Sequence, residues 1–175
     1  NVAISAVFDA NTVENGTIIF PAKLFSDIVR KLPGGEDVYI EADDGYQIKI
    51  SCGGTVFNIM GASPEDFPEI PSVLDENRVE LTVSAFKRLI KHTVYAASQT
   101  DLKPILTGIL FEINDSESFI SAVGLDQYRL ALKRESFEYK SGDINNFIVP
   151  AKTLKELLNI LPEESENNIR ICVSE

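Results

Sequence analysis

The side chains that could perform chemistry are few in this sequence. His92 is the only histidine among the 175 residues, and it lies between Lys91 and Thr93 in a segment with helical spacing. A Ser–His–Asp or Cys–His site would therefore depend on this one imidazole. No phosphate-binding loop of the G-x-x-x-x-G-K-[ST] or G-x-G-x-x-G kind occurs. These residues favour a solvated histidine over a catalytic one.

The two cysteines and the paired acids have plain structural explanations. Cys52 and Cys172 lie in apolar, alternating segments, which predicts reduced strand residues rather than a disulfide framework or metal ligands. Acid pairs such as Asp43-Asp44 fall in predicted turns, where solvation explains them. We therefore predict no enzyme activity, no catalytic residues, no metal and no cofactor. A hydrolase that uses paired carboxylates stays open as an alternative.

Composition and charge narrow the class of protein. Apolar residues make up 44% of the chain, enough to support a core. The formal net charge of −11, taken alone, argues against a nucleic-acid partner. No run of 18 apolar residues predicts a membrane span. The chain begins at Asn1 without a charged-then-apolar leader, so we expect a fragment of a cytoplasmic protein with no membrane partner.

Apolar spacing predicts an α+β chain. Alternating and β-branched runs predict strands, which we place at residues 2–8, 17–20, 38–42, 46–51, 56–60, 79–83, 105–113, 119–123, 128–137, 147–149 and 169–173. Residues 62–71 carry three prolines and three acids, which is typical of a linker.

Three segments have helical spacing instead. They are residues 22–32, 84–98 and 151–161. Ser84 is the predicted N-cap of the second, and Pro21 and Pro150 stand at or near the first helical position of the other two. Each predicted helix directly follows a short predicted strand.

The first and third helical segments belong to an internal repeat. Residues 19–33 read I-F-P-A-K-L-F-S-D-I-V-R-K-L-P, and residues 148–162 read I-V-P-A-K-T-L-K-E-L-L-N-I-L-P. Six of these 15 ungapped positions are identical. Residues 79–90 form a weaker third copy of strand followed by helix. The repeat indicates one unit, a strand, a helix and a meander of strands, that is used several times.

Basic residues concentrate in the helical segments. These segments hold eight of the 16 basic residues but only two of the 27 acidic ones, so they carry +6 while the remainder carries −17. The eight are Lys23, Arg30, Lys31, Lys87, Arg88, Lys91, Lys152 and Lys155. Helix propensity alone would favour glutamate there as well. We therefore predict a basic helical face that contacts phosphates without reading bases, because no aromatic interleaving or recognition-helix pattern accompanies it.

Four runs of sequence resemble the bacterial DNA sliding clamps, the beta subunits of the replicative polymerase. They are T-I-I-F-P-A-K-L-F-S-D-I-V-R-K-L-P at 17–33, I-S-C-G-G-T-V-F-N-I-M-G-A-S-P-E-D-F-P-E-I-P at 50–71, K-P-I-L-T-G-I-L-F-E-I at 103–113 and N-F-I-V-P-A-K-T-L-K-E-L at 146–157. They occur in the family's order and together cover essentially the whole chain.

The resemblance implies a fold and a function. The fold would be the DNA clamp fold, in which repeated strand–helix–antiparallel-strand units place their helices on one side of the sheets. Residues 1–70 would be the C-terminal part of the first clamp domain, and residues 71–175 most of the second. The full-length protein would be a homodimeric ring around double-stranded DNA, placed by a clamp loader, that tethers the replicative DNA polymerase. An acidic protein–protein interaction module without a DNA role is the alternative.

The family also has a hydrophobic cleft for partner peptides. By position, the part of its wall in this chain would be Lys103, Leu106, Leu125, Gln127, Tyr128, Arg129 and Leu130. Where the family typically shows A-T-D-x-H-R-L, this chain shows G-L-D-Q-Y-R-L at 124–130, and lysine replaces a common arginine at 103. These departures leave the detailed shape and the peptide preference open. Leu106 and Leu130 could alternatively be core residues.

Overall fold

A computed structural model describes residues 3–70, 73, 75–100, 102–144, 146–163, 165 and 167–174. The chain forms two units that divide at about residue 71, and each is described by itself. No helix among these residues is long and apolar enough to cross a membrane.

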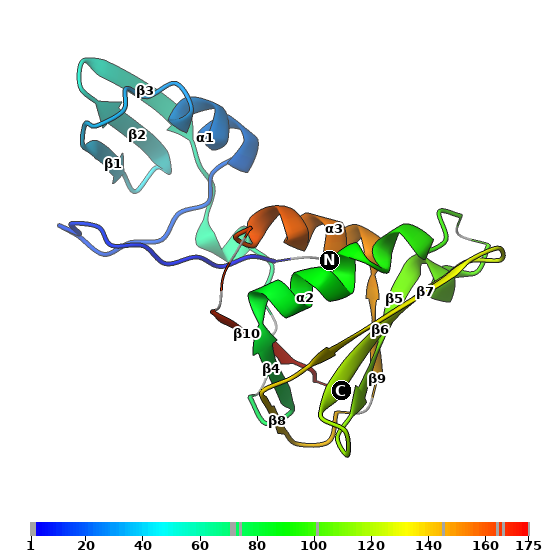
Figure 1. Ribbon diagram of the computed structural model, residues 1–175. Coiled ribbons are helices and arrows are strands. Elements are labelled where there is room, and N and C mark those ends of the chain that lie inside the picture. Colours follow the sequence, from blue (N-terminus) through cyan, green and yellow to red (C-terminus); the bar gives the residue numbers. More distant parts are fainter. Residues whose placement is uncertain are drawn as a thin grey trace. The chain divides into compact units, whose positions relative to one another are not determined.

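The first unit is one helix on a small meander. Helix α1 (Ala22–Val29) precedes strands β1 (Val38–Ala42), β2 (Gln47–Cys52) and β3 (Thr55–Met60), which pair antiparallel in the order β1-β2-β3 (Figure 1). Ile28 of α1 packs with Ile48 and Ile50 of β2, and all three side chains are buried. The period of two along β2 and the helical spacing of α1 thus place their apolar faces against each other.

Two predicted strands of this unit are wrong. Residues 3–8 form no strand, and Val2 lies outside the described residues. Residues 17–20 contribute only a single bridge, from Ile19 to Ala62. Alternation alone does not make a strand, because the backbone needs a partner for its hydrogen bonds. The predicted linker contains one short 3₁₀ helix, Pro64–Asp66, and Pro71 lies outside the described residues.

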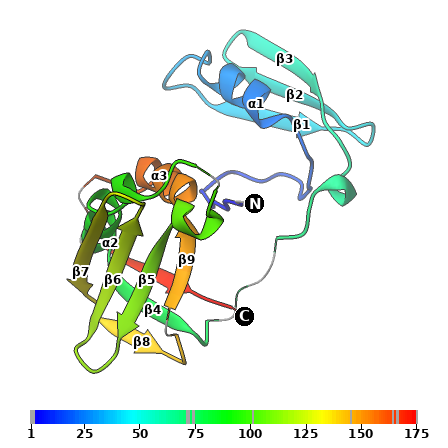
Figure 2. The same cartoon turned by 90° about the vertical axis from the view of Figure 1, so that its right-hand side faces the viewer.

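The second unit has two antiparallel sheets. One sheet has the order β10-β4-β8 and the other the order β7-β6-β5-β9 (Figure 2). The strands are β4 (Arg78–Thr82), β5 (Gly108–Asn114), β6 (Phe119–Leu125), β7 (Leu130–Ser136), β8 (Tyr139–Ser141), β9 (Asn146–Pro150) and β10 (Asn168–Cys172). All except β8 were predicted, with ends that differ by a few residues. The two cysteines are free, and they lie in strands β2 and β10 as expected.

Two helices lie side by side over these sheets. They are α2 (Val83–Lys91) and α3 (Ala151–Ile160), and both views show them on the same side of the unit (Figures 1 and 2). The buried core joins Phe86 and Leu89 of α2 and Leu154 of α3 to Ile109 and Phe111 of β5. One apolar stripe on each helix therefore faces the sheets and leaves the opposite face to solvent.

The helix ends differ from the prediction in detail. Thr82, not Ser84, is the N-cap of α2, since its Oγ1 accepts a hydrogen bond from the Ala85 N–H at 3.1 Å. The hydroxyl of Ser84 instead donates to the Ser165 carbonyl at 2.9 Å. Pro150 is the N-cap of α3 and Pro21 that of α1, each without a side-chain cap. Helix α2 ends at Lys91, and the remainder of the predicted segment holds a short 3₁₀ helix, Val94–Ala96.

The internal repeat has a structural counterpart. Helices α1 and α3 occupy equivalent places, and β1 and β10 follow them in the same way. Strand β10 pairs with β4 on one edge, from Asn168 opposite Thr82 to Cys172 opposite Arg78. No strand among the described residues takes that place beside β1, and all five residues of β1 are exposed. By the repeat, β1 corresponds to β10. Because the first unit has no described counterpart of β4, one edge of the apolar strand β1 is left without a neighbouring strand.

Candidate nucleic-acid interface and partner pocket

The three predicted DNA-facing residues of the first unit lie at the two ends of α1. Lys23, Arg30 and Lys31 are all exposed. Only Lys23 lies within the helix, because Arg30 is its C-cap and Lys31 follows it. Asp27 is also exposed on α1 and reduces the local positive charge.

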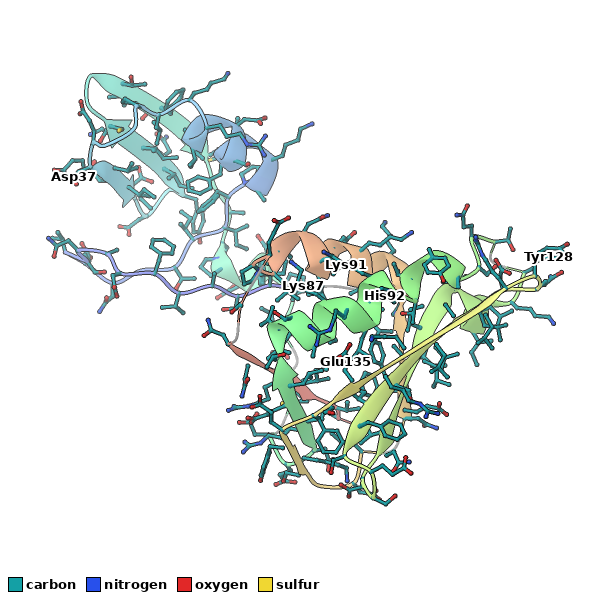
Figure 3. The ribbon with its side chains drawn as sticks, in the orientation of Figure 1. Asp37, Lys87, Lys91, His92, Tyr128 and Glu135 are labelled. Atoms are coloured by element: carbon teal, nitrogen blue, oxygen red, sulfur yellow. The ribbon has the colours of Figure 1, made fainter. Side chains whose placement is uncertain are left out.

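Lys87 does not lie on a solvent-facing basic surface, which corrects its prediction as a DNA-facing residue. Its side chain is buried, with only 5% of the residue exposed. The ammonium donates hydrogen bonds to the carbonyl oxygens of Leu161 and Pro162, at 3.2 and 2.7 Å. These carbonyls lie just beyond the last turn of α3, where backbone acceptors have no partner within the helix. Lys87 therefore joins α2 to the end of α3 (Figure 3).

Arg88 is exposed but its charge is largely compensated. Its Nε and Nη2 donate to the two carboxylate oxygens of Glu135 on β7, at 2.9 and 2.8 Å. Lys133 also lies 3.0 Å from this carboxylate. The hydrogen bond from Arg88, assisted by Lys133, holds the pKa of Glu135 below its ordinary value of 4.5. The bidentate pair fixes the orientation of the guanidinium toward the sheet.

Three lysines remain exposed on the two neighbouring helices. They are Lys91 on α2 and Lys152 and Lys155 on α3, and none forms an ion pair within the part of the chain that the structure describes. His92 is the C-cap of α2 and is also exposed, as expected for a solvated imidazole. The candidate interface in this unit is thus smaller than the sequence predicted, and both helices contribute to it.

The predicted partner pocket centres on the hairpin between β6 and β7. Asp126 organises the turn: its Oδ1 accepts hydrogen bonds from the N–H groups of Tyr128 and Arg129 at 2.8 and 3.0 Å. Its Oδ2 accepts from Arg129 Nε at 2.9 Å. Gln127 and Tyr128 therefore stand at the tip, where Tyr128 is 93% exposed (Figure 3).

Protonation of Asp126 should loosen this turn only at acid pH. The hydrogen bond from the Tyr128 N–H, followed by those from Arg129, lowers the pKa of Asp126 below 3.8. A carboxylate whose pKa is depressed by folding stabilises above its unfolded pKa, and loses that contribution as pH falls through the folded pKa. An NMR titration of the Asp126 carboxyl carbon and the Tyr128 amide should therefore give one shared midpoint below 3.8. Asp126→Asn should abolish the amide transition, and a midpoint at or above 3.8 would contradict the assignment.

The other predicted pocket residues lie at the same end of the sheet. Strand β5 begins where β6 ends, so the 3₁₀ helix Pro104–Thr107, which carries Leu106, lies near Leu125. Leu130 is 63% exposed and is not a core residue, whereas Leu106 is half-buried. Lys103 is exposed at the start of this 3₁₀ helix.

Sequence reasoning missed several exposed apolar side chains close to these residues in sequence. They are Leu102, Ile105 and Leu132. Alternation along β7 could have identified Leu132, because Leu130 and Leu132 point to the side opposite the buried Ala131. The exposed apolar groups make this end of the unit suited to contact with another protein.

Two sequence families match the chain in consecutive segments. The N-terminal domain of the DNA polymerase III beta subunit matches residues 1–71. The central domain of the same subunit matches residues 80–175.

Individual proteins similar to this chain belong to the same family of beta subunits. The beta sliding clamp of Halalkalibacterium halodurans is 33% identical over 164 residues, which cover 93% of this chain and 42% of that protein. That of Staphylococcus aureus is 33% identical over 157 residues, with 90% and 41% coverage. The chain therefore spans about two fifths of the length of these relatives.

Solved structures show the same fold. A crystal structure of a putative DNA polymerase III beta subunit from Eubacterium rectale superposes with a TM-score of 0.86 at 34% identity, covering 95% of this chain and 44% of that one. The DNA polymerase sliding clamp from Bacillus subtilis gives 0.84 at 31% identity, covering 91% and 41%. The chain thus has the α+β clamp fold, and it belongs to the family of the DNA polymerase III beta subunits, the beta sliding clamps.

Proposed function

We propose that the whole protein is a DNA polymerase processivity factor. It closes as a homodimeric ring around duplex DNA without sequence specificity, and it tethers the replicative polymerase and other partners in the cytoplasm. Residues 1–70 supply the C-terminal part of the first clamp domain, and residues 71–175 most of the second. The observation that most supports this is that two consecutive domains of one clamp subunit match this chain in order.

The distribution of charge supports contact with DNA that is weak and mobile. Lys91, Lys152 and Lys155 are exposed on two adjoining helices, while the chain as a whole carries a net charge of −11. Side chains on a few helices can attract phosphates while the acidic remainder disfavours adhesion elsewhere. Lys23, Arg30 and Lys31 would contribute in the same way from the first unit. Lys87 has no part in this contact, and Arg88 contributes little because Glu135 compensates it.

Such a ring needs no chemical step. Its hold on DNA is topological, and it acts by raising the effective concentration of a tethered polymerase at the primer end. Binding of partners would use the apolar side chains around the 126–129 turn, including Leu125 and Leu130, which are 39% and 63% exposed. Arg129, fixed by Asp126, would orient polar groups of a docked peptide.

The proposal predicts that retention depends on the topology of the DNA. The full-length protein is loaded onto nicked circular plasmid by its loader, and retention is compared by gel filtration before and after linearisation. We expect the ring to stay on circles and to leave linear DNA almost completely. Linear DNA with both ends blocked by bound protein is the matched control and should restore retention. Equal loss from circular and linear DNA would contradict the ring and favour a protein–protein interaction module instead.

A further inference from the structure

A cavity of about 350 Å³ opens between the two candidate surfaces of the second unit. It lies where the 3₁₀ helix Val94–Ala96 meets the start of α3 and the β6–β7 turn. It shares Arg129 with the partner pocket and Lys155 with the basic helical face. Its polar lining residues are Tyr95, Ser98, Gln99, Arg129 and Lys155. The volume falls within the range of small-molecule sites.

The charge of the cavity selects an anion. Arg129 and Lys155 line it from different elements, and no carboxylate is among the lining residues that the structure describes. Within the described parts of the chain, Asp126 is the one acid that binds Arg129, and it accepts a hydrogen bond from Arg129 Nε. Among the described residues, the two terminal nitrogens of Arg129 have no protein partner, and Lys155 has none for its ammonium. Two cations on one concave surface can bind a phosphate by charge-assisted hydrogen bonds.

The other lining residues are suited to bind a planar aromatic base that is attached to the phosphate. Tyr95 lines the cavity and is 57% exposed, so its ring is accessible for stacking. Gln99 supplies an amide that can both donate and accept hydrogen bonds. Ala151 is small and leaves room beside α3. Aromatic stacking combined with cations is how proteins hold nucleotides without reading sequence.

We propose that this cavity binds one nucleotide, with its phosphate between Arg129 and Lys155 and its base against Tyr95. The nucleotide is either free or one unit of a DNA strand, and in the second case the inference rests on the proposed function. Because Arg129 belongs to the partner pocket and Lys155 to the basic helical face, an occupied cavity would link the two surfaces.

NMR of the ¹⁵N-labelled 175-residue chain tests this with deoxythymidine monophosphate, inorganic phosphate and d(T)4 as probes. We expect the monophosphate to shift the amides of Tyr95, Gln99 and Lys155. Lys155→Glu should weaken binding about tenfold, and Tyr95→Ala about fivefold or more. Lys49→Glu, at an exposed lysine of β2 outside both the cavity and the predicted DNA-facing set, should change it less than about twofold. Amide spectra of each variant establish that it is folded.

The outcomes separate the possibilities. Tighter binding of d(T)4 than of the monophosphate assigns the site to a DNA strand, and equal binding assigns it to a free nucleotide. Inorganic phosphate that binds as tightly as the nucleotide, without an effect of Tyr95→Ala, would reduce the cavity to a plain anion site and overturn the proposal. Cavity amides that do not shift, or a loss of binding in Lys49→Glu equal to that in Lys155→Glu, would also overturn the proposal. Ring retention on circular DNA does not depend on the cavity, so failure here leaves that test unaffected.

Discussion

Replacing Lys87 by methionine should lower the free energy of unfolding of the second unit by about 2–3 kcal/mol. Methionine keeps most of the length and apolar volume of the side chain, so packing changes little. It cannot donate to the carbonyl oxygens of Leu161 and Pro162, which the ammonium contacts at 3.2 and 2.7 Å. These acceptors would lose a charged donor whose own side chain is buried, and that loss dominates the effect. Urea unfolding followed by NMR signals of the second unit measures it.

Lys91→Met is the matched control for this experiment. Lys91 lies one turn further along the same helix but is exposed, with no ion pair among the described residues. Its replacement should change the free energy of unfolding by less than about 0.5 kcal/mol. In the full-length protein, by contrast, Lys91 is the residue we expect to contact DNA. Equal destabilisation by the two variants would show that Lys87 does not hold the two helices together.

The case of Lys87 shows where sequence patterns stop being informative. In the sequence, Lys87, Arg88 and Lys91 form one polar flank of a helix opposite Phe86, Leu89 and Ile90. The structure gives the three basic residues different roles, because their partners come from distant parts of the chain. The acceptors of Lys87 lie 74 and 75 residues away, and Glu135 lies 47 residues from Arg88. No local spacing encodes these contacts, so a helical pattern predicts polarity but not exposure.

Strands were predictable where local sequence encodes the pairing. The Asp43-Asp44-Gly45 turn joins β1 to β2, and Asp43 Oδ1 accepts hydrogen bonds from the N–H groups of Gly45 and Gln47, each at 2.9 Å. Residues 3–8 alternate equally well but pair with no strand among the described residues and form none themselves. Strand β8 has only three residues, too few for a period of two to be recognised.

The candidate sites also differ in whether local sequence could predict them. The hairpin residues around Asp126 were located by a contiguous motif, which the resemblance to a family made visible. The cavity beside Tyr95 was not predicted, because its walls come from three separate segments of the chain. Tyr95 and Lys155 are 60 residues apart in sequence, and only the packing of α3 beside the Val94–Ala96 turn brings both to one cavity.

The second large effect is expected at Phe111, at the centre of the second unit. Its side chain is fully buried on β5. The ring stacks on that of Phe147 of β9 at 5.2 Å between centroids and on that of Phe86 of α2 at 6.2 Å. This row of three rings connects the helix layer to the sheet, so it supports the helix that carries Lys91. Phe111→Ala should lower the free energy of unfolding by about 3–5 kcal/mol, since the neighbours cannot fill the cavity left behind.

Two further variants show whether this loss comes from buried packing. Phe111→Leu keeps much of the apolar volume and should cost less than half as much as the alanine variant. Tyr128→Ala removes an aromatic ring that is 93% exposed and should change stability by less than about 0.5 kcal/mol. In urea unfolding, the loss of stability should be largest for Phe111→Ala, smaller for Phe111→Leu and smallest for Tyr128→Ala. A small loss for Phe111→Ala would mean that helix α2 is held mainly by other contacts, such as buried Leu89 and Ile90 and the bonds of Lys87, and not by the aromatic row beneath it.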